Sequence, residues 1–156
     1  MLTRNGVQLI EYNARFGDPE CQVLMTRLED DLGELLLACA EGRLATRQPP
    51  RLSGNTALTV VMAAAGYPGT PRAGGAIAGI AAAEAGGAKV FHAGTALLDG
   101  QLVANGGRVL NVTARGANVT EAQATAYAAV DQIKAPDLFC RRDIGWREVA
   151  REAEDA

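Results

Sequence analysis

The sequence predicts an α+β protein in two parts, residues 1–48 and residues 49–156. The first part carries the signals of a hairpin followed by two helices, whereas the second is rich in β-branched runs bracketed by glycine and asparagine. A polar, proline-containing stretch over residues 45–54 separates them and has the composition of a linker. We therefore expect the second part to be a small β-rich domain with one or two helices.

The composition is that of a globular protein. The 156 residues are 48% hydrophobic, which is enough for a core. The formal net charge of −3 is not the positive charge typical of nucleic-acid binding. No apolar run is long enough to cross a bilayer. Cys21, Cys39 and Cys140 have neither the spacing of a zinc site nor the even number of a disulfide framework. We expect a cytoplasmic chain that binds no nucleic acid and no membrane.

The first part predicts a hairpin and a helix. Asn5-Gly6 is a strong hairpin signal, although the arm before it, residues 1–3, is shorter than an ordinary strand. Because of that short arm, we expect the chain to be a piece of a longer protein. Asp18 is a favoured N-cap residue and Pro19 suits the first helical position, so a helix is predicted to begin there.

A second helix is predicted after the acidic residues 29–31, and it should end at Gly42. Its apolar residues recur at helical spacing, which predicts a stripe buried in the core. The stripe consists of Leu32, Leu35, Leu36, Cys39 and Ala40.

The second part predicts strands over residues 56–65, 89–98, 101–104, 108–114 and 138–140. Asp99-Gly100 joins two of them as a hairpin signal. Thr120 and Gln123 form a capping-box pattern, which predicts a helix with inward-facing alanines that ends before Pro136. The charged residues from Trp146 onward predict a surface helix.

Polar side chains follow the apolar segment 7–10 at alternating positions. Because side chains two apart on a strand point to the same side, an extended chain would place Glu11, Asn13 and Arg15 on one face. A carboxylate and an amide oxygen suit a hard cation such as Mg²⁺, and a guanidinium suits anionic charge beside it. An exposed strand end with unrelated polar residues would show the same pattern, so the spacing leaves both interpretations open.

Five strings of residues resemble one known family in order and spacing. They are Glu11-Tyr12-Asn13-Ala14-Arg15-Phe16-Gly17-Asp18-Pro19-Glu20, Gly66-Tyr67-Pro68, Phe91-His92-Ala93-Gly94-Thr95, Gly106-Gly107-Arg108-Val109-Leu110 and Arg142-Asp143-Ile144-Gly145. The chain resembles the phosphoribosylamine-glycine ligases, also called glycinamide ribonucleotide synthetases, which belong to the ATP-grasp class. The resemblance covers nearly the whole chain but only the C-terminal third or so of the family's length.

The resemblance implies an activity and a metal site. The family uses ATP to join glycine to 5-phosphoribosylamine through glycyl phosphate, which gives glycinamide ribonucleotide in purine biosynthesis. Residues 1–48 would then be the end of the ATP-grasp domain. Glu11 and Asn13 resemble the family's ligands of Mg²⁺ or Mn²⁺, and Arg15 resembles its catalytic arginine. The expected partners are ATP, glycine, 5-phosphoribosylamine and the N-terminal part of the same enzyme, and the chain alone is expected to be inactive.

Four residues are further candidates for substrate binding, namely Gly17, Asp18, Pro19 and Arg108. The turn before the first helix would present free N–H groups to an anion, although helix capping explains the same residues. Arg108 would suit the substrate phosphate, although a hairpin turn explains the glycines before it equally well. His92, the only histidine, is expected to be structural. Arg142 and Asp143 are expected to form an ion pair.

Two other hypotheses stay open. The chain has neither G-x-x-x-x-G-K-[ST] nor G-x-G-x-x-G, so it would fit a packing or interaction module that folds without turnover. It would also fit another ATP-grasp amide ligase, because related enzymes share the Glu-x-Asn arrangement. The Arg-Phe-Gly-Asp-Pro-Glu and His-Ala-Gly-Thr strings argue against that second hypothesis.

Overall fold

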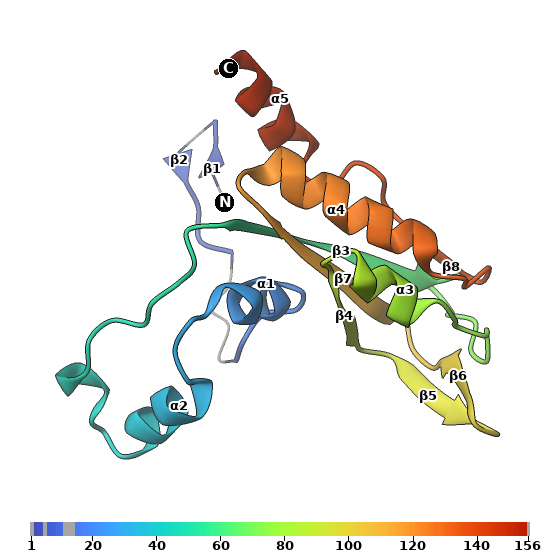
Figure 1. The fold of residues 1–156 in the computed structure, drawn as a ribbon, viewed down its shortest axis with the longest axis horizontal. Helices are drawn as coiled ribbons and strands as arrows, with labels where there is room; N and C mark the ends of the chain where they lie inside the picture. Colours follow the sequence, from blue (N-terminus) through green and yellow to red (C-terminus); the bar gives the residue numbers. More distant parts are fainter. Residues whose placement is uncertain (1, 5, 11–14, 156) are drawn as a thin grey trace.

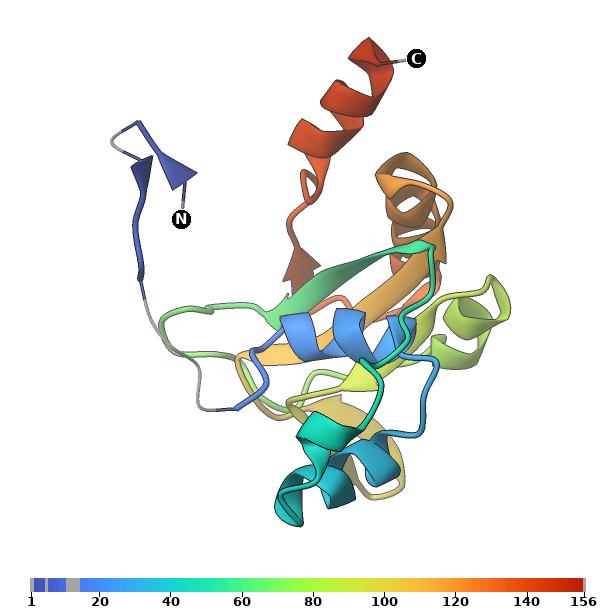
Figure 2. The same cartoon turned by 90° about the vertical axis from the view of Figure 1, so that its left-hand side faces the viewer.

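A four-stranded antiparallel sheet forms the centre of the computed structural model, which describes residues 2–4, 6–10 and 15–155. The sheet has the order β4-β7-β3-β8 and carries helices on both faces (Figure 1, Figure 2). Its strands are β3 (Thr56–Ala64), β4 (Lys89–His92), β7 (Arg108–Gly116) and β8 (Leu138–Cys140). This mixture of sheet and helices agrees with the predicted α+β class.

The hydrophobic core lies between the sheet and two helices, α3 (Ile80–Ala85) and α4 (Val119–Gln132). The register pairs Val60 with Val112 and Met62 with Leu110, so alternate residues of β3 and β7 face α4. The helix presents its small residues to them, as predicted. The buried side chains of α4 are Ala122, Ala126, Ala129 and Val130.

The opposite face of the sheet is more polar and is crossed by α1 (Glu20–Arg27), as Figure 2 shows. The Thr113 hydroxyl donates to the Thr59 hydroxyl at 2.8 Å. Asn111 is fully buried, and its side-chain amide has no hydrogen-bond partner among the described residues. A polar face that one short helix covers leaves room for a site beside that helix.

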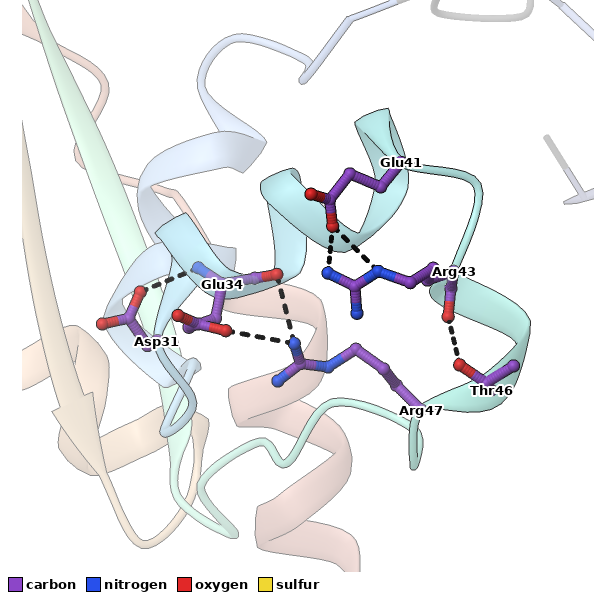
Figure 3. Close-up of polar contacts among 6 residues, drawn as sticks. All are labelled: Asp31, Glu34, Glu41, Arg43, Thr46 and Arg47. Carbon is purple, nitrogen blue, oxygen red and sulfur yellow. Dashed lines mark hydrogen bonds and ion pairs between the residues drawn. The ribbon is translucent and has the colours of Figure 1, made fainter.

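A small helical unit, α2 (Leu32–Ala40) with the 3-10 turn η1 (Leu44–Thr46), is held by polar contacts (Figure 3). The Asp31 carboxylate accepts from the Glu34 N–H at 3.0 Å, and Arg47 donates to the Glu34 carboxylate at 3.3 Å. Arg43 pairs with Glu41. The predicted start after residues 29–31 is confirmed.

The predicted burial of the α2 stripe is wrong. Within α2 only Ala38 is buried, whereas the Leu36 side chain is 52% exposed. Helical spacing reveals which side chains share a face, but another element must cover that face to bury it. Here residues of α1 and of segment 44–52 face the stripe across an open hollow, so Leu32 and Leu35 are only half-buried.

The predicted single strand over residues 89–98 is two strands, β4 and β5 (Thr95–Leu98). The break falls at Gly94, where a Cβ atom would lie 2.7 Å from the Arg108 carbonyl oxygen and 2.9 Å from the Gly106 Cα. Backbone approach this close excludes a side chain. After the break, β5 pairs with β6 (Gln101–Ala104) around Asp99-Gly100, which confirms that hairpin.

Three smaller predictions also change. Asn118 rather than Thr120 caps α4, because the Asn118 side chain accepts from the Glu121 N–H at 2.9 Å. The N-terminal hairpin of β1 (Leu2–Thr3) and β2 (Gly6–Val7) forms, but Thr3 pairs with Gly6, which is therefore in a strand and not in the turn. Residues 49–155 contain three helices, α3, α4 and α5 (Trp146–Glu154), not one or two. In the described residues no helix is long and apolar enough to span a membrane.

Glu152 connects α5 to the start of α4. Its carboxylate accepts from the Val119 N–H at 2.8 Å, the Thr120 N–H at 3.0 Å and the Thr120 hydroxyl at 2.7 Å. These hydrogen bonds lower the pKa of Glu152 below its ordinary value. A carboxylate with a lowered folded-state pKa stabilises the fold above its unfolded-state pKa of about 4.5, and this contribution is lost as the pH falls through the folded-state value.

We expect Glu152→Gln to lower the melting temperature at pH 7 by a few degrees, because an amide cannot accept all three bonds. The melting temperatures of parent and variant should converge as the pH falls below about 4.5, where the parent loses its charge as well. Glu154→Gln, an exposed change on the same helix, is the control. Equal melting of parent and Glu152→Gln at pH 7 would contradict this role.

Candidate functional site

Asp18 and Arg108, two predicted substrate residues, lie against each other although 90 positions separate them. The Arg108 Nη2 atom lies 2.9 Å from the Asp18 Oδ2 atom, and Arg108 Nη1 donates to the Asp18 carbonyl oxygen at 3.2 Å. Both side chains are 39% exposed, so a ligand can reach the pair. The pair joins the turn before α1 to the first residue of β7.

The prediction that Asp18 caps the first helix is wrong. The helix begins at Glu20, its cap position is Pro19, and no side chain makes a cap hydrogen bond there. The Asp18 carboxylate binds Arg108 instead. Capping therefore no longer explains why an aspartate stands at this position.

Gly17 and Glu20 shape the turn that carries Asp18. The Gly17 N–H donates to the Glu20 Oε1 atom at 3.2 Å, and a Cβ atom at Gly17 would lie 2.4 Å from that carboxylate. A side chain at this buried position would therefore displace Glu20. Arg15, the predicted catalytic residue, is exposed, and its Nη1 atom donates to the Phe16 carbonyl at 2.7 Å. Its guanidinium is open to solvent just before the turn.

The predicted metal ligands, Glu11 and Asn13, lie outside the described residues, so the metal site stays a prediction. Among residues 2–4, 6–10 and 15–155, no three histidine, cysteine or acidic side chains cluster as a metal site would require. The described part of the chain thus offers no competing site of that kind.

A pocket of about 620 Å³ adjoins the Asp18–Arg108 pair on the α1 face of the sheet. Pro19 and Arg108 line it, together with Ala63 of β3, Phe139 of β8 and Arg141 just beyond β8. Its size is within the usual range for small-molecule sites. The structure thus brings Asp18, Pro19 and Arg108 to the edge of one hollow.

Cys140 also lines this pocket, and its chemistry is limited by burial. Desolvation raises the pKa of the Cys140 thiol above its ordinary value. A thiol with a raised pKa stays protonated near neutral pH and is a poor nucleophile. His92 lies elsewhere, with its Nδ1 atom 3.1 Å from the Thr95 hydroxyl oxygen.

Arg141 is a pocket residue that sequence reasoning missed. The expected ion pair between Arg142 and Asp143 is wrong, since Asp143 binds Arg141 at 2.7 and 2.9 Å. Arg142 instead binds Asp131 at 2.7 Å. Arg142, which stands in one of the quoted strings, indicated a charged position at the end of β8. Neighbouring side chains on an extended chain point in opposite directions, so the two arginines do not share a side.

The part of the chain that forms the sheet and its helices matches a known family. Residues 57–147 match the family model described as "Phosphoribosylglycinamide synthetase, C domain". The chain belongs to this family. The matched interval falls within the predicted second part, residues 49–156.

Curated relatives carry the name phosphoribosylamine-glycine ligase. The one from Mesorhizobium japonicum is 63% identical over 152 residues, which are 97% of this chain and 36% of that protein. The one from Escherichia coli K12 is 52% identical over 93% of this chain and 34% of that protein. A crystal structure of phosphoribosylamine-glycine ligase from Thermotoga maritima is similar with a TM-score of 0.71 and 33% identity, over 92% of this chain and 35% of that one. The chain thus spans about a third of the length of the relatives it matches.

Proposed function

We propose that this chain is the C-terminal part of an ATP-dependent phosphoribosylamine-glycine ligase of the ATP-grasp class. The observation that carries the proposal is the 63% identity, over 97% of the chain, to a relative of that name. The proposed reaction is the ATP-driven joining of glycine to 5-phosphoribosylamine in purine biosynthesis. Glycine's carboxylate takes the terminal phosphoryl group of ATP and releases ADP, and the amine then attacks the acyl carbon and releases phosphate.

Each candidate side chain suits one task in that reaction. Carboxylate and amide oxygens on Glu11 and Asn13 fit Mg²⁺ or Mn²⁺, which when bound would neutralise phosphate oxygens. Arg15 would stabilise the negative charge that develops at the acyl phosphate. Asp18 would accept a hydrogen bond from the attacking amine and so orient the amine toward the acyl carbon. Arg108 would bind the phosphate of 5-phosphoribosylamine.

The remaining two thirds of the ligase would be the main partner of this chain. Relatives of the given name extend well beyond the matched residues, and ATP would bind in that additional part. For this reason residues 1–156 alone are proposed to be inactive.

The test is ADP release by the complete polypeptide that contains this chain. It should release ADP only when glycine and 5-phosphoribosylamine are both present, whereas residues 1–156 alone should release none. ADP release in the absence of glycine or of 5-phosphoribosylamine would overturn the proposal. A screen of other amine and carboxylate substrates would detect a different ATP-grasp amide ligase.

A second candidate function is a non-catalytic interaction module. It is favoured by the short coverage of the relatives and by exposed leucines at positions 36, 37, 44 and 52. Glycine-dependent ADP release by the complete polypeptide separates the two, because residues 1–156 alone are inactive under both proposals. Such release, lowered by Glu11→Ala, would rule out the module.

A further inference from the structure

We propose that Asn105, in the turn between β6 and β7, is a site of spontaneous deamidation, and that its isoaspartate product displaces Arg108 from Asp18. The inference goes beyond the proposed function, because it concerns a covalent change of the chain itself and needs neither ATP nor substrate. Asn105 is exposed and is followed by Gly106. Solvent water is the only other reactant.

The reaction is a ring closure between the Asn105 side chain and the peptide bond that follows it. The backbone nitrogen of Gly106 attacks the Cγ atom of Asn105 and forms a C–N bond. The side-chain amide nitrogen leaves as ammonia, together with the proton that the Gly106 nitrogen gives up. Water then adds to one of the two carbonyl carbons of the cyclic imide and breaks the bond from that carbon to nitrogen. Attack at Cγ gives aspartate, whereas attack at the main-chain carbonyl carbon gives isoaspartate, whose main chain runs through the former side chain.

The structure leaves both reacting groups unengaged. The side-chain amide of Asn105 makes no hydrogen bond to any residue that the structure describes, so it can turn toward the main chain. The Gly106 N–H likewise donates to none of the described residues. Glycine has no Cβ atom, so nothing on Gly106 obstructs the approach of the amide carbon to the backbone nitrogen. The carbon and the nitrogen that must join are therefore both accessible to each other.

The other asparagines among the described residues each lack at least one of these conditions. Asn55 is exposed but precedes Thr56, whose β-branched side chain crowds the attacking nitrogen. The Asn118 side chain accepts a hydrogen bond from the Glu121 N–H at 2.9 Å, which holds it away from its own main chain. Asn111 is fully buried, out of reach of the water that completes the reaction. The turn between β6 and β7 is therefore the favoured site in the described part of the chain.

The turn has no room for the longer main chain of isoaspartate. The Asn105 N–H donates to the Gly94 carbonyl oxygen at 2.8 Å, and the Gly94 N–H donates to the Arg108 carbonyl oxygen at 3.0 Å. Gly94 thus holds both ends of the turn. A Cβ atom on Gly106 would lie 3.0 Å from the Gly94 Cα, so the two backbones already touch. Isoaspartate adds one C–C bond, about 1.5 Å, to the main chain between these fixed points.

The contacts of Arg108 with Asp18 are the ones that yield. The added length cannot push the turn the other way, because a Cβ atom on Gly107 would lie only 2.6 Å from the Tyr67 ring. Arg108 begins β7 directly after the turn and reaches the Asp18 carboxylate at 2.9 Å. Both of its partners are partly exposed, and an exposed ion pair resists displacement less than the paired strands behind it. Aspartate at position 105 adds the same charge without the added length, so it leaves Arg108 in place.

The experiment ages the folded complete polypeptide at mildly alkaline pH and follows its peptides by mass spectrometry. The peptide with Asn105 should gain the mass difference between –OH and –NH₂ about tenfold or more faster than the peptides with Asn55 and Asn118, which both precede a β-branched residue. Isoaspartyl methyltransferase, which methylates isoaspartate and not aspartate, should label this peptide in the aged parent. It should not label it in Asn105→Gln, because glutamine must close a larger ring and does so more slowly. If the Asn105 peptide converted no faster than the Asn55 peptide in the folded protein, the site would be overturned.

Thermal melting tests the displacement of Arg108. Ageing should lower the melting temperature of the parent but not that of Asn105→Gln, and freshly prepared Asn105→Asp should melt like the fresh parent because its main chain is unchanged. Arg108→Ala has no ion pair with Asp18 to lose, so ageing should lower its melting temperature less than that of the parent. An equal fall in Arg108→Ala and the parent, or no fall in a parent whose Asn105 peptide is labelled, would overturn the displacement. None of these measurements depends on ADP release.

Discussion

Replacing Glu11 by alanine in the complete ligase is expected to lower kcat by about 100-fold or more, a loss typical for removing one stabilising group from a charged transition state. In the proposed reaction the change deletes an oxygen ligand of the divalent cation, so phosphate charge would no longer be neutralised where the acyl phosphate would form. Steady-state ADP release at saturating ATP, glycine and 5-phosphoribosylamine measures the effect.

Glu29→Ala is the control for charge and composition. Glu29 is an exposed carboxylate in the same part of the chain, so its removal should leave kcat and melting unchanged. Glu11→Asp keeps a carboxylate and should recover some turnover at a higher Mg²⁺ concentration. Parent-like kcat in Glu11→Ala would refute the metal role.

The central sheet and its main helix could be predicted because local and long-range signals agree there. The β-branched run from Thr56 is a strand, and the alanine face of α4 lies against the sheet as its spacing indicates. The same reasoning wrongly predicted that Leu36 is buried, because periodicity is a local property, whereas burial requires a second surface. The strand break at Gly94 depends on the approach of Gly106, which no local pattern reveals.

The candidate site was predictable as a set of residues but not as an arrangement. Resemblance identified Asp18 and Arg108, and their contact depends on how α1 packs across the sheet. Arg141 was missed because its direction follows from the pairing of β8 with β3. Sequence shows two adjacent arginines and cannot distinguish which one faces the α1 side.

Leu110→Ala is expected to lower the free energy of unfolding of this chain by about 2 to 5 kcal/mol. Leu110 is fully buried, pairs with Met62 in the sheet and belongs to the core beneath α4. The facing residues of α4 are mostly alanines, which have no side-chain length with which to fill the space. The cavity should therefore persist and keep the cost towards the upper part of that range. Urea unfolding of residues 1–156 measures it.

Leu36→Ala removes the same atoms from a side chain that is 52% exposed, so its cost in this chain should stay within about 1 kcal/mol. Comparable losses for the two variants would contradict the assigned core.

The same two variants can be compared in the complete ligase. If the rest of the enzyme packs on the apolar face of α2, Leu36→Ala should cost more there than in residues 1–156, while the cost of Leu110→Ala should be unchanged because its surroundings already lie within this chain.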